Sequence, residues 1–247
     1  MADKNCPVCR GTGWKLKHEQ NIDLVERCEC ARKDRQDELF QTARIPKRYR
    51  TCTFDSYILD RRCKESQHLA KRSVEHFVKA YPAIEAGFLL MGPPGTGKTH
   101  LAVAAIRALM EEKGVRCLFY DFRDLLKTLQ RSYSKDASFT EISILQPVLQ
   151  TEVFVLDELG ASKMSPWVQD TLTHILNHRY NEKLITIITS NWMDKDIDNQ
   201  NEETLDKRIG YRLRSRLYEM CQTIRISGSD YRQYLHAKNE NRVAQLL

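Results

Sequence analysis

Residues 92–99 read Gly92-Pro93-Pro94-Gly95-Thr96-Gly97-Lys98-Thr99, which is the pattern of a phosphate-binding loop. An apolar run at 87–91 precedes the loop, and His100 begins a stretch with helical spacing after it. A strand that ends in a glycine-rich turn at a helix N-terminus directs backbone N–H groups and the positive end of the helix dipole toward a polyphosphate. Lys98 is expected to reach the outer phosphates, and the Thr99 hydroxyl is expected to ligate Mg²⁺. A chance match is the alternative, and the flanking strand and helix argue against it.

Two carboxylates follow a second apolar run, which is Val153-Phe154-Val155-Leu156. Ligands of parallel sheets bind at the carboxyl ends of the strands. Asp157 is therefore predicted to hold Mg²⁺ through water, and Glu158 to orient and polarise an attacking water. An ordinary strand that ends in a solvated acidic turn is the alternative. The intact phosphate-binding loop upstream favours the catalytic interpretation.

Short apolar runs alternate with helical stretches along most of the chain. Strands are predicted at 88–91, 116–120, 153–156, 184–189 and 223–226, and helices at 66–81, 99–113, 123–132, 140–150, 166–181 and 204–220. This alternation predicts an α/β fold with a five-stranded parallel sheet that helices cover on both faces. Asn191 follows the fourth strand, where its amide is a candidate for sensing the γ-phosphate or holding the lytic water. Taken alone, it fits a solvated strand end better.

The composition indicates a globular protein with one substantial domain and a small appendage. The chain has 247 residues, of which 41% are hydrophobic and 29% charged, and its net charge is +6. This surplus permits a nucleic-acid partner without requiring one. No apolar stretch approaches the length of a membrane span, and the N-terminus lacks the apolar core of a secretory signal. We therefore expect a cytoplasmic protein without a membrane partner.

Residues 1–45 differ from the rest, because they hold half of the eight cysteines and few apolar runs. Cys6 and Cys9 form a C-x₂-C knuckle, and Cys28 and Cys30 form a second close pair. Four thiolates in two such pairs can close a tetrahedron around Zn²⁺. The second pair has an unusual single-residue spacing, so His18 is a substitute candidate, and free thiols are a further alternative. The pattern predicts a zinc-binding domain and linker at 1–45 and a second domain at 46–247, with a helix and then a linker within 31–50.

Basic residues crowd the segment 207–217. Arg212 and Arg216 are four positions apart, so they project from the same side of a helix. One of them is a candidate for an arginine finger that reaches the nucleotide of a neighbouring copy, which contributes roughly 10³–10⁵ to the rate in other NTPases. A solvent-facing basic helix and a nucleic-acid-binding helix are the alternatives, and composition does not separate these three.

Five motifs together resemble those of bacterial replicative-helicase loaders of the DnaC/DnaI type, which are AAA+ ATPases, and the similar IstB-type transposition helpers. They are Thr99-His100-Leu101-Ala102 after the loop, residues 153–160, Thr189-Ser190-Asn191, the pair Arg212 and Arg216, and Asp230-Tyr231-Arg232. The resemblance covers about residues 45–240. It implies that Lys98 and Thr99 belong to Walker A, Asp157 and Glu158 to Walker B, Asn191 to sensor 1 and Arg232 to sensor 2. Arg216 is implied as the arginine finger with Arg212 beside it. Only fifteen residues follow Arg232, so a truncated lid is expected, as in loaders.

The resemblance also implies contacts with single-stranded DNA in two regions. Arg131 and Tyr133 lie at the end of one predicted helix, and Ser165 and Trp167 lie just beyond Walker B. Aromatic side chains give stacking platforms worth roughly 1–3 kcal/mol per base. Partial burial in the core is the alternative for Tyr133 and Trp167.

The function that the resemblance implies is an ATP- and Mg²⁺-dependent loader. Residues 1–45 would bind a hexameric replicative DNA helicase of the DnaB type, and the remainder would self-associate through the ATP interface and deliver the helicase onto single-stranded DNA. A helper ATPase of a transposase is one alternative, and an ATP-binding adaptor without turnover is another. The zinc arm favours the loader, because the helper family generally lacks it. Asp157, Glu158 and Arg216 weigh against the adaptor.

Overall fold

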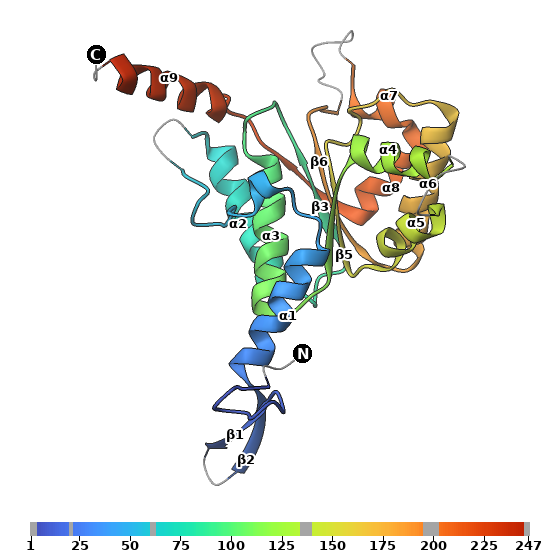
Figure 1. The fold of residues 1–247 in the computed structure, drawn as a ribbon. Coiled ribbons are helices and arrows are strands. Elements are labelled where there is room, and N and C mark those ends of the chain that lie inside the picture. Colours follow the sequence, from blue (N-terminus) through green and yellow to red (C-terminus); the bar gives the residue numbers. More distant parts are fainter. Residues whose placement is uncertain (1–3, 20–21, 60–62, 134–139, 195–202, 245–247) are drawn as a thin grey trace.

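The computed structural model describes residues 4–19, 22–59, 63–133, 140–194 and 203–244. Its centre is a five-stranded sheet in the order β4-β5-β6-β3-β7, in which all neighbours are parallel (Figure 1). The strands are β3 (Gly87–Met91), β4 (Cys117–Asp121), β5 (Val153–Asp157), β6 (Ile185–Ser190) and β7 (Cys221–Arg225). The predicted α/β class and the predicted parallel sheet are therefore confirmed.

Helices cover both faces of the sheet (Figure 1). One face carries α1 (Glu29–Thr42), α2 (Glu65–Ala80) and α3 (Lys98–Lys113), and the other carries α4 (Phe122–Ser132), α5 (Glu141–Gln150), α6 (Pro166–Asn181), α7 (Leu205–Ile209) and α8 (Tyr211–Met220). Successive strand residues point to opposite faces. Phe88 and Leu90 therefore join the core beneath α3, whereas Leu89 and Met91 join the core beneath α4 to α8. Double-sided burial explains why the strands read as unbroken apolar runs.

The structure differs from the sequence-based elements in three places. The single helix predicted at 204–220 is two helices, because Gly210 between them has a φ of 87° that no helix contains. Two strands, β1 (Trp14–Glu19) and β2 (Ile22–Arg27), form an antiparallel hairpin that was not predicted. A last helix, α9 (Tyr231–Ala244), was not predicted either, and it projects away from the sheet (Figure 1).

Helix α1 connects the hairpin to the sheet. Its second half packs along α3, where Gln36 donates to the Glu111 carbonyl at 2.8 Å, and Leu39 is buried in the core. The chain then passes the edge strand β4, where the Phe119 N–H donates to the Ala43 carbonyl at 2.8 Å. A short 3₁₀ turn, Lys47–Tyr49, follows Pro46. The sequence 31–50 is thus a helix followed by a linker, as predicted, and α1 begins already at Glu29.

Within the described ranges, none of the helices combines the length and the apolar character that crossing a lipid bilayer requires.

Candidate functional site: a nucleotide pocket and a cysteine cluster

The phosphate-binding loop joins β3 to α3 through backbone conformations that require glycine. Gly95 has a φ of 79°, and a Cβ there would lie 1.9 Å from the Asp230 carboxylate. Gly97 has a φ of 89°, and a Cβ there would lie 2.4 Å from the Tyr57 ring. Glycine is therefore required at both positions, because the backbone is left-handed there and side chains from distant segments occupy the space of a Cβ. The predicted strand, turn and helix N-terminus are all present.

Lys98 folds back over the loop that precedes it. Its Nζ donates to the carbonyls of Gly92 and Pro93, both at 2.8 Å, and its side chain is buried. Burial lowers the pKa of Lys98 to about 8, although the carboxylates of Asp157 and Glu158 act in the opposite direction. A polyphosphate at the loop would supply the counter-charge that the ammonium group lacks in this position. The geometry therefore fits the predicted role of Lys98.

Asp157 ends β5 beside the first turn of α3. Its carboxylate accepts hydrogen bonds from the hydroxyls of Thr99, at 2.9 Å, and Thr189, at 2.6 Å. Burial raises the pKa of Asp157 to about 6, against the two hydroxyl donors. Mg²⁺ prefers hard oxygen ligands, and the two predicted ligands, Thr99 and Asp157, present such oxygens within hydrogen-bonding distance of each other. The donor set thus fits the predicted magnesium site.

Glu158 occupies a backbone conformation that is rare for its residue type. Its φ is 58°, in the left-handed region, and its N–H donates to the Thr189 hydroxyl at 3.0 Å. Such conformations cost about 1–3 kcal/mol and cluster at functional sites. Glu158, Thr189 and Asn191 all line the same pocket. Thr189 is thus a site residue that had no predicted role of its own, although it belongs to the motif that ends in Asn191.

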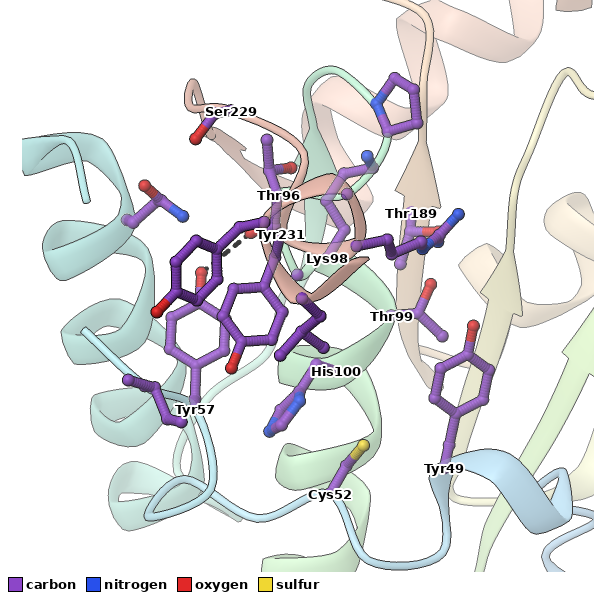
Figure 2. Close-up of a pocket in the computed structure, with 18 of the residues that line it drawn as sticks. Tyr49, Cys52, Tyr57, Thr96, Lys98, Thr99, His100, Thr189, Ser229 and Tyr231 are labelled. Carbon is purple, nitrogen blue, oxygen red and sulfur yellow. Dashed lines mark hydrogen bonds between the residues drawn. The ribbon is translucent and has the colours of Figure 1, made fainter. Parts of the chain in front are cut away.

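The rest of the pocket wall combines His100 and Tyr231, which belong to motifs recognised in the sequence, with Tyr49 and Tyr57, which the sequence did not connect with the site. Figure 2 shows Tyr57, His100 and Tyr231 on one side of the pocket and Tyr49 on the other. His100 Nε2 lies 2.9 Å from the Thr53 carbonyl and 3.1 Å from the Ser56 hydroxyl, and Tyr57 donates to the Thr96 carbonyl at 3.0 Å. Burial lowers the pKa of His100. This wall of rings suits the flat, largely apolar face of a nucleobase.

Helix α9 begins at the rim of the same pocket. The Tyr231 N–H donates to the Gly95 carbonyl at 3.1 Å, which ties the start of α9 to the phosphate-binding loop. Arg232 lines the pocket, as expected for a sensor 2 arginine. Pro94, Thr96 and His100 line it as well.

Arg212 and Arg216 lie elsewhere. Neither of them lines the pocket in the described part of this chain; Arg212 is exposed on α8, and Arg216 is half-buried there. Arg214, between them, is buried and forms two hydrogen bonds of 2.7 Å with the Asp194 carboxylate. The structure thus brings together the predicted Walker and sensor residues and separates the two arginines from them.

The four predicted zinc ligands converge at the base of the hairpin. The sulfur atoms of Cys6, Cys9, Cys28 and Cys30 all lie within 4.8 Å of one another. Burial would raise the pKa of Cys9, but backbone N–H donors and neighbouring thiols outweigh it and lower the pKa to about 7. A thiolate is the form that binds Zn²⁺, so the donor set fits a zinc site. His18 is not a member of this group; it lies on β1 and pairs with Asp23.

The two predicted DNA-contacting regions meet in space. The rings of Tyr133 and Trp167 stand edge to face, with centroids 6.2 Å apart. Tyr133 is 54% exposed, and its hydroxyl donates to Glu141 at 2.7 Å, whereas Trp167 packs partly against the core. Ser165 caps α6 by accepting the Val168 N–H, so it has a structural role. Arg131 is exposed near the end of α4.

Residues 8–239 match the family described as IstB-like ATP binding protein. The chain belongs to this ATP-binding family. The replicative helicase loader DnaC of Buchnera aphidicola subsp. Acyrthosiphon pisum (strain APS) is 25% identical over 187 residues, which are 76% of this chain and 72% of that protein. A putative ATP-binding protein of the insertion sequence IS21 from Pseudomonas aeruginosa is 33% identical over 145 residues, which are 58% of this chain and 51% of that protein.

A crystal structure of the DnaC helicase loader superposes on 73% of this IstB-like chain and 99% of its own length, with 34% identity and a TM-score of 0.64. The resemblance to loaders and transposition-associated ATP-binding proteins is therefore confirmed at the level of the family and the AAA+ fold.

Proposed function

We propose that this IstB-like chain is an ATP-dependent loader that binds a hexameric replicative helicase of the DnaB type and delivers it onto single-stranded DNA. The observation that carries the proposal is the convergence of Lys98, Thr99, Glu158 and Asn191 on one pocket. Asp157 lies directly behind them and is hydrogen-bonded to Thr99. Such a constellation suits a phosphoryl-transfer site. The similarity to loader sequences and the four-cysteine hairpin support the loader over other ATPases. A protein with this role acts on DNA, in the cytoplasm.

In the proposed ATPase cycle, Lys98 exchanges the carbonyls of its own loop for the outer phosphates of ATP. Glu158 polarises the attacking water, and Asn191 orients it from the neighbouring strand end. Thr99 and Asp157 would hold Mg²⁺, which supplies positive charge to the phosphate oxygens when it is bound. The left-handed backbone at Glu158 directs its carboxylate, and the Thr189 hydroxyl holds this backbone by accepting the N–H of Glu158 itself.

Self-association is the second part of the proposal. Arg216 is absent from the pocket of its own chain but lies on a helix face with Arg212, so a second copy is the natural recipient. A head-to-tail arrangement would place Arg216 of one copy beside the nucleotide of the next. ATP would then complete the contact between copies, and hydrolysis would weaken it.

Helicase binding is assigned to the N-terminal hairpin. Residues 4–19 and 22–30, here called the cysteine module, expose apolar side chains that have no core to enter. Trp14 is 49% exposed, Leu16 66% and Val25 64%, and the strand register places all three on one face of the hairpin. An exposed apolar face of this kind suits a protein partner.

Single-stranded DNA is assigned to the aromatic pair. Tyr133 and Trp167 offer two rings beside exposed Arg131, which suits stacking of bases and attraction of phosphates. Trp167→Ala is expected to weaken ATP-dependent binding of a fluorescent oligodeoxythymidylate by about 5- to 150-fold, which corresponds to roughly 1–3 kcal/mol. Undiminished affinity would remove this assignment.

The loading function is tested with the full chain as bait for the replicative helicase of its source cell. Wild type is expected to retain the hexamer and to stimulate helicase entry onto a circular single strand coated with binding protein. Cys28→Ser is expected to lose the helicase while it still binds ATP. Capture of a recombinase in place of a helicase, with preference for duplex DNA, would instead support a transposition helper, which the similarity to the IS21 protein favours.

The adaptor alternative is tested by turnover. The ATPase rate of wild type with single-stranded DNA is compared with that of Glu158→Gln, which keeps the pocket shape. We expect a fall of at least about 100-fold, because the variant lacks the group that polarises water. Equal, near-zero rates would support an ATP-binding adaptor.

A further inference from the structure

A tight turn follows the Walker B carboxylates. The Ala161 N–H donates to the Glu158 carbonyl at 3.0 Å, and Gly160 has a φ of 84°. The turn is fixed to the end of β6, because the Leu159 N–H donates to the Thr189 carbonyl at 2.8 Å and the Leu159 carbonyl accepts from the Ser190 hydroxyl at 2.9 Å. The turn and the strand end that carries Asn191 therefore form one unit.

Arg208, on α7, holds this unit from outside the pocket. Its guanidinium lies 3.7 Å from the centre of the Trp192 ring and donates to the Gly160 carbonyl at 2.7 Å. A further hydrogen bond of 2.7 Å joins it to the Glu203 carboxylate, and only 17% of the side chain is exposed. Gly160 leaves room for the indole, since a Cβ there would lie 3.0 Å from Trp192.

The contacts of Arg208 are adjacent in sequence to the two groups expected to act on water. Gly160 is two residues after Glu158, and Trp192 directly follows Asn191. Arg208 therefore touches both strand ends at the point where they leave the pocket, yet it is not itself among the lining residues of the described pocket.

Helix α7 continues almost directly into α8. Only Gly210 separates them, and the Arg214 N–H donates to its carbonyl at 3.1 Å. The helix that starts there carries Arg212 and Arg216. With so short a connection, the placement of α7 on the turn also sets the placement of α8.

We infer that Arg208 is a positioning residue for the neighbouring copy: it anchors α7 to the turn after Glu158 and thereby places Arg216 in the pocket of the next protomer. The inference rests on the proposed function, because it requires Arg216 to act in trans. A planar guanidinium is suited to this role, since it stacks on an indole and donates to a carbonyl and a carboxylate at once. Lysine lacks both the plane and the fork.

A subunit-mixing experiment separates this role from an effect on the pocket of the same chain. ATPase rates of the full chain with single-stranded DNA are measured for Arg208→Gln alone and after 1:1 mixing with Glu158→Gln, whose subunits retain Arg216 but do not turn over ATP. Arg208→Gln alone is expected to bind ATP normally and to lose about 10- to 100-fold in kcat, the scale of a misplaced catalytic group. In the mixture, about one quarter of head-to-tail interfaces join an Arg208→Gln pocket to an intact donor helix, so the rate should recover to about a quarter of the wild-type value.

Two matched variants calibrate the result. Arg216→Ala, which lacks the donated group itself, should recover in the same mixture. Asn191→Ala, whose lesion lies in the pocket, should not recover. Recovery of Arg216→Ala without recovery of Arg208→Gln would overturn the inference and leave the proposed function standing. Failure of both to recover would count against the arginine that acts in trans, and so against the proposed function itself.

A conservative variant keeps the experiment decisive if Arg208→Gln does not fold, as judged by its melting temperature. Arg208→Lys retains a positive charge beside Glu203 but not the stacking on Trp192. It should show a smaller fall in kcat and the same recovery on mixing. A wild-type kcat for Arg208→Lys, with unchanged affinity between copies, would contradict the role of the guanidinium.

Discussion

The ATP-binding body, which consists of the sheet and its helices, and the cysteine module are stabilised in different ways. In the body, strand residues such as Leu89, Leu90 and Met91 are fully buried between two helical layers. In the described part of the module, the buried hydrophobic positions before α1 are cysteines, while Leu16 and Val25 face solvent. Burial stabilises the body, whereas we propose that the module depends on a zinc ion held by its four thiolates. A change that destabilises one of the two parts should therefore leave the stability of the other nearly unchanged.

Metal removal is expected to have the largest effect, and only on the module. Structural Zn²⁺ contributes about 10–16 kcal/mol in small zinc-dependent folds. A chelator should abolish hydrogen-exchange protection in the hairpin strands β1 and β2, while the strands of the sheet stay protected and ATP affinity is unchanged. Persistent protection of the hairpin in metal-free protein would show that it folds without an ion.

Arg179→Met is expected to have the next largest effect, and only on the body. Arg179 is fully buried on α6, and its guanidinium donates hydrogen bonds to four acceptors in the interior. These acceptors are the carbonyls of Val148, Thr151 and Ile185 and the hydroxyl of Thr186. The variant leaves these buried acceptors without a donor. It should therefore lower the free energy of unfolding by about 3–5 kcal/mol, as measured by urea denaturation.

The matched control for that variant is Arg123→Met. Arg123 also donates to a carbonyl, that of Ala161 at 2.8 Å, but from an exposed position on α4. We expect a loss of less than about 1 kcal/mol, because water replaces the exposed donor. Equal losses for both variants would refute the assignment of the cost to burial. The zinc content should be unchanged in either case.

Alkaline pH should weaken the body through its buried thiols. Cys221 is buried at the start of β7, and this burial raises the pKa of its thiol to about 12, against the nearby charges of Arg214 and Arg179. A raised pKa gives stability that is fully present below the ordinary value of 9.0 and is lost as the pH rises toward 12. Cys221→Ala should therefore lose less stability above pH 9 than wild type, by about 1.4 kcal/mol per pH unit. Urea denaturation across this range measures the two slopes, and parallel slopes would contradict the prediction.

The smallest effect is expected for Leu16→Ala in the module. Leu16 is 66% exposed on β1. Its truncation should therefore change the free energy of unfolding of the zinc-bound protein by no more than about 0.5 kcal/mol. Leu90→Ala in β3 removes the same atoms from a fully buried site and should cost about 2–5 kcal/mol. A helicase-binding assay sharpens the contrast, since Leu16→Ala should weaken binding and Leu90→Ala should not at temperatures where it stays folded.

Much of the nucleotide site was predictable because its chemistry lies in short contiguous motifs. The loop 92–99, Asp157 and Glu158, and Asn191 each follow a strand that reads as an apolar run. Tyr57 and Tyr49 were not predicted, because they reach the pocket only through the path of the linker after α1. No local pattern distinguishes them from other tyrosines.

The hairpin and the two C-terminal elements were missed because periodicity detects only certain features. Period-two alternation reveals a strand only when one of its faces is buried, and both faces of β1 and β2 are exposed. The pattern at 204–220 is helical on both sides of Gly210, so periodicity alone did not reveal the break between α7 and α8. In α9, the side chains of residues 231–238 are all exposed, so this part of the helix has no core-facing stripe to detect.

The hydrogen bond between Ala43 and Phe119 has a practical consequence for dissecting the protein. It occupies the N–H of Phe119 on β4, one of the two edge strands of the sheet, which would otherwise be open to pairing with a foreign chain. A shortened protein that starts at residue 46 would uncover this strand and should precipitate as intermolecular ribbons form. One that starts at residue 29 keeps α1 and should stay monodisperse, which makes that position the better place to cut.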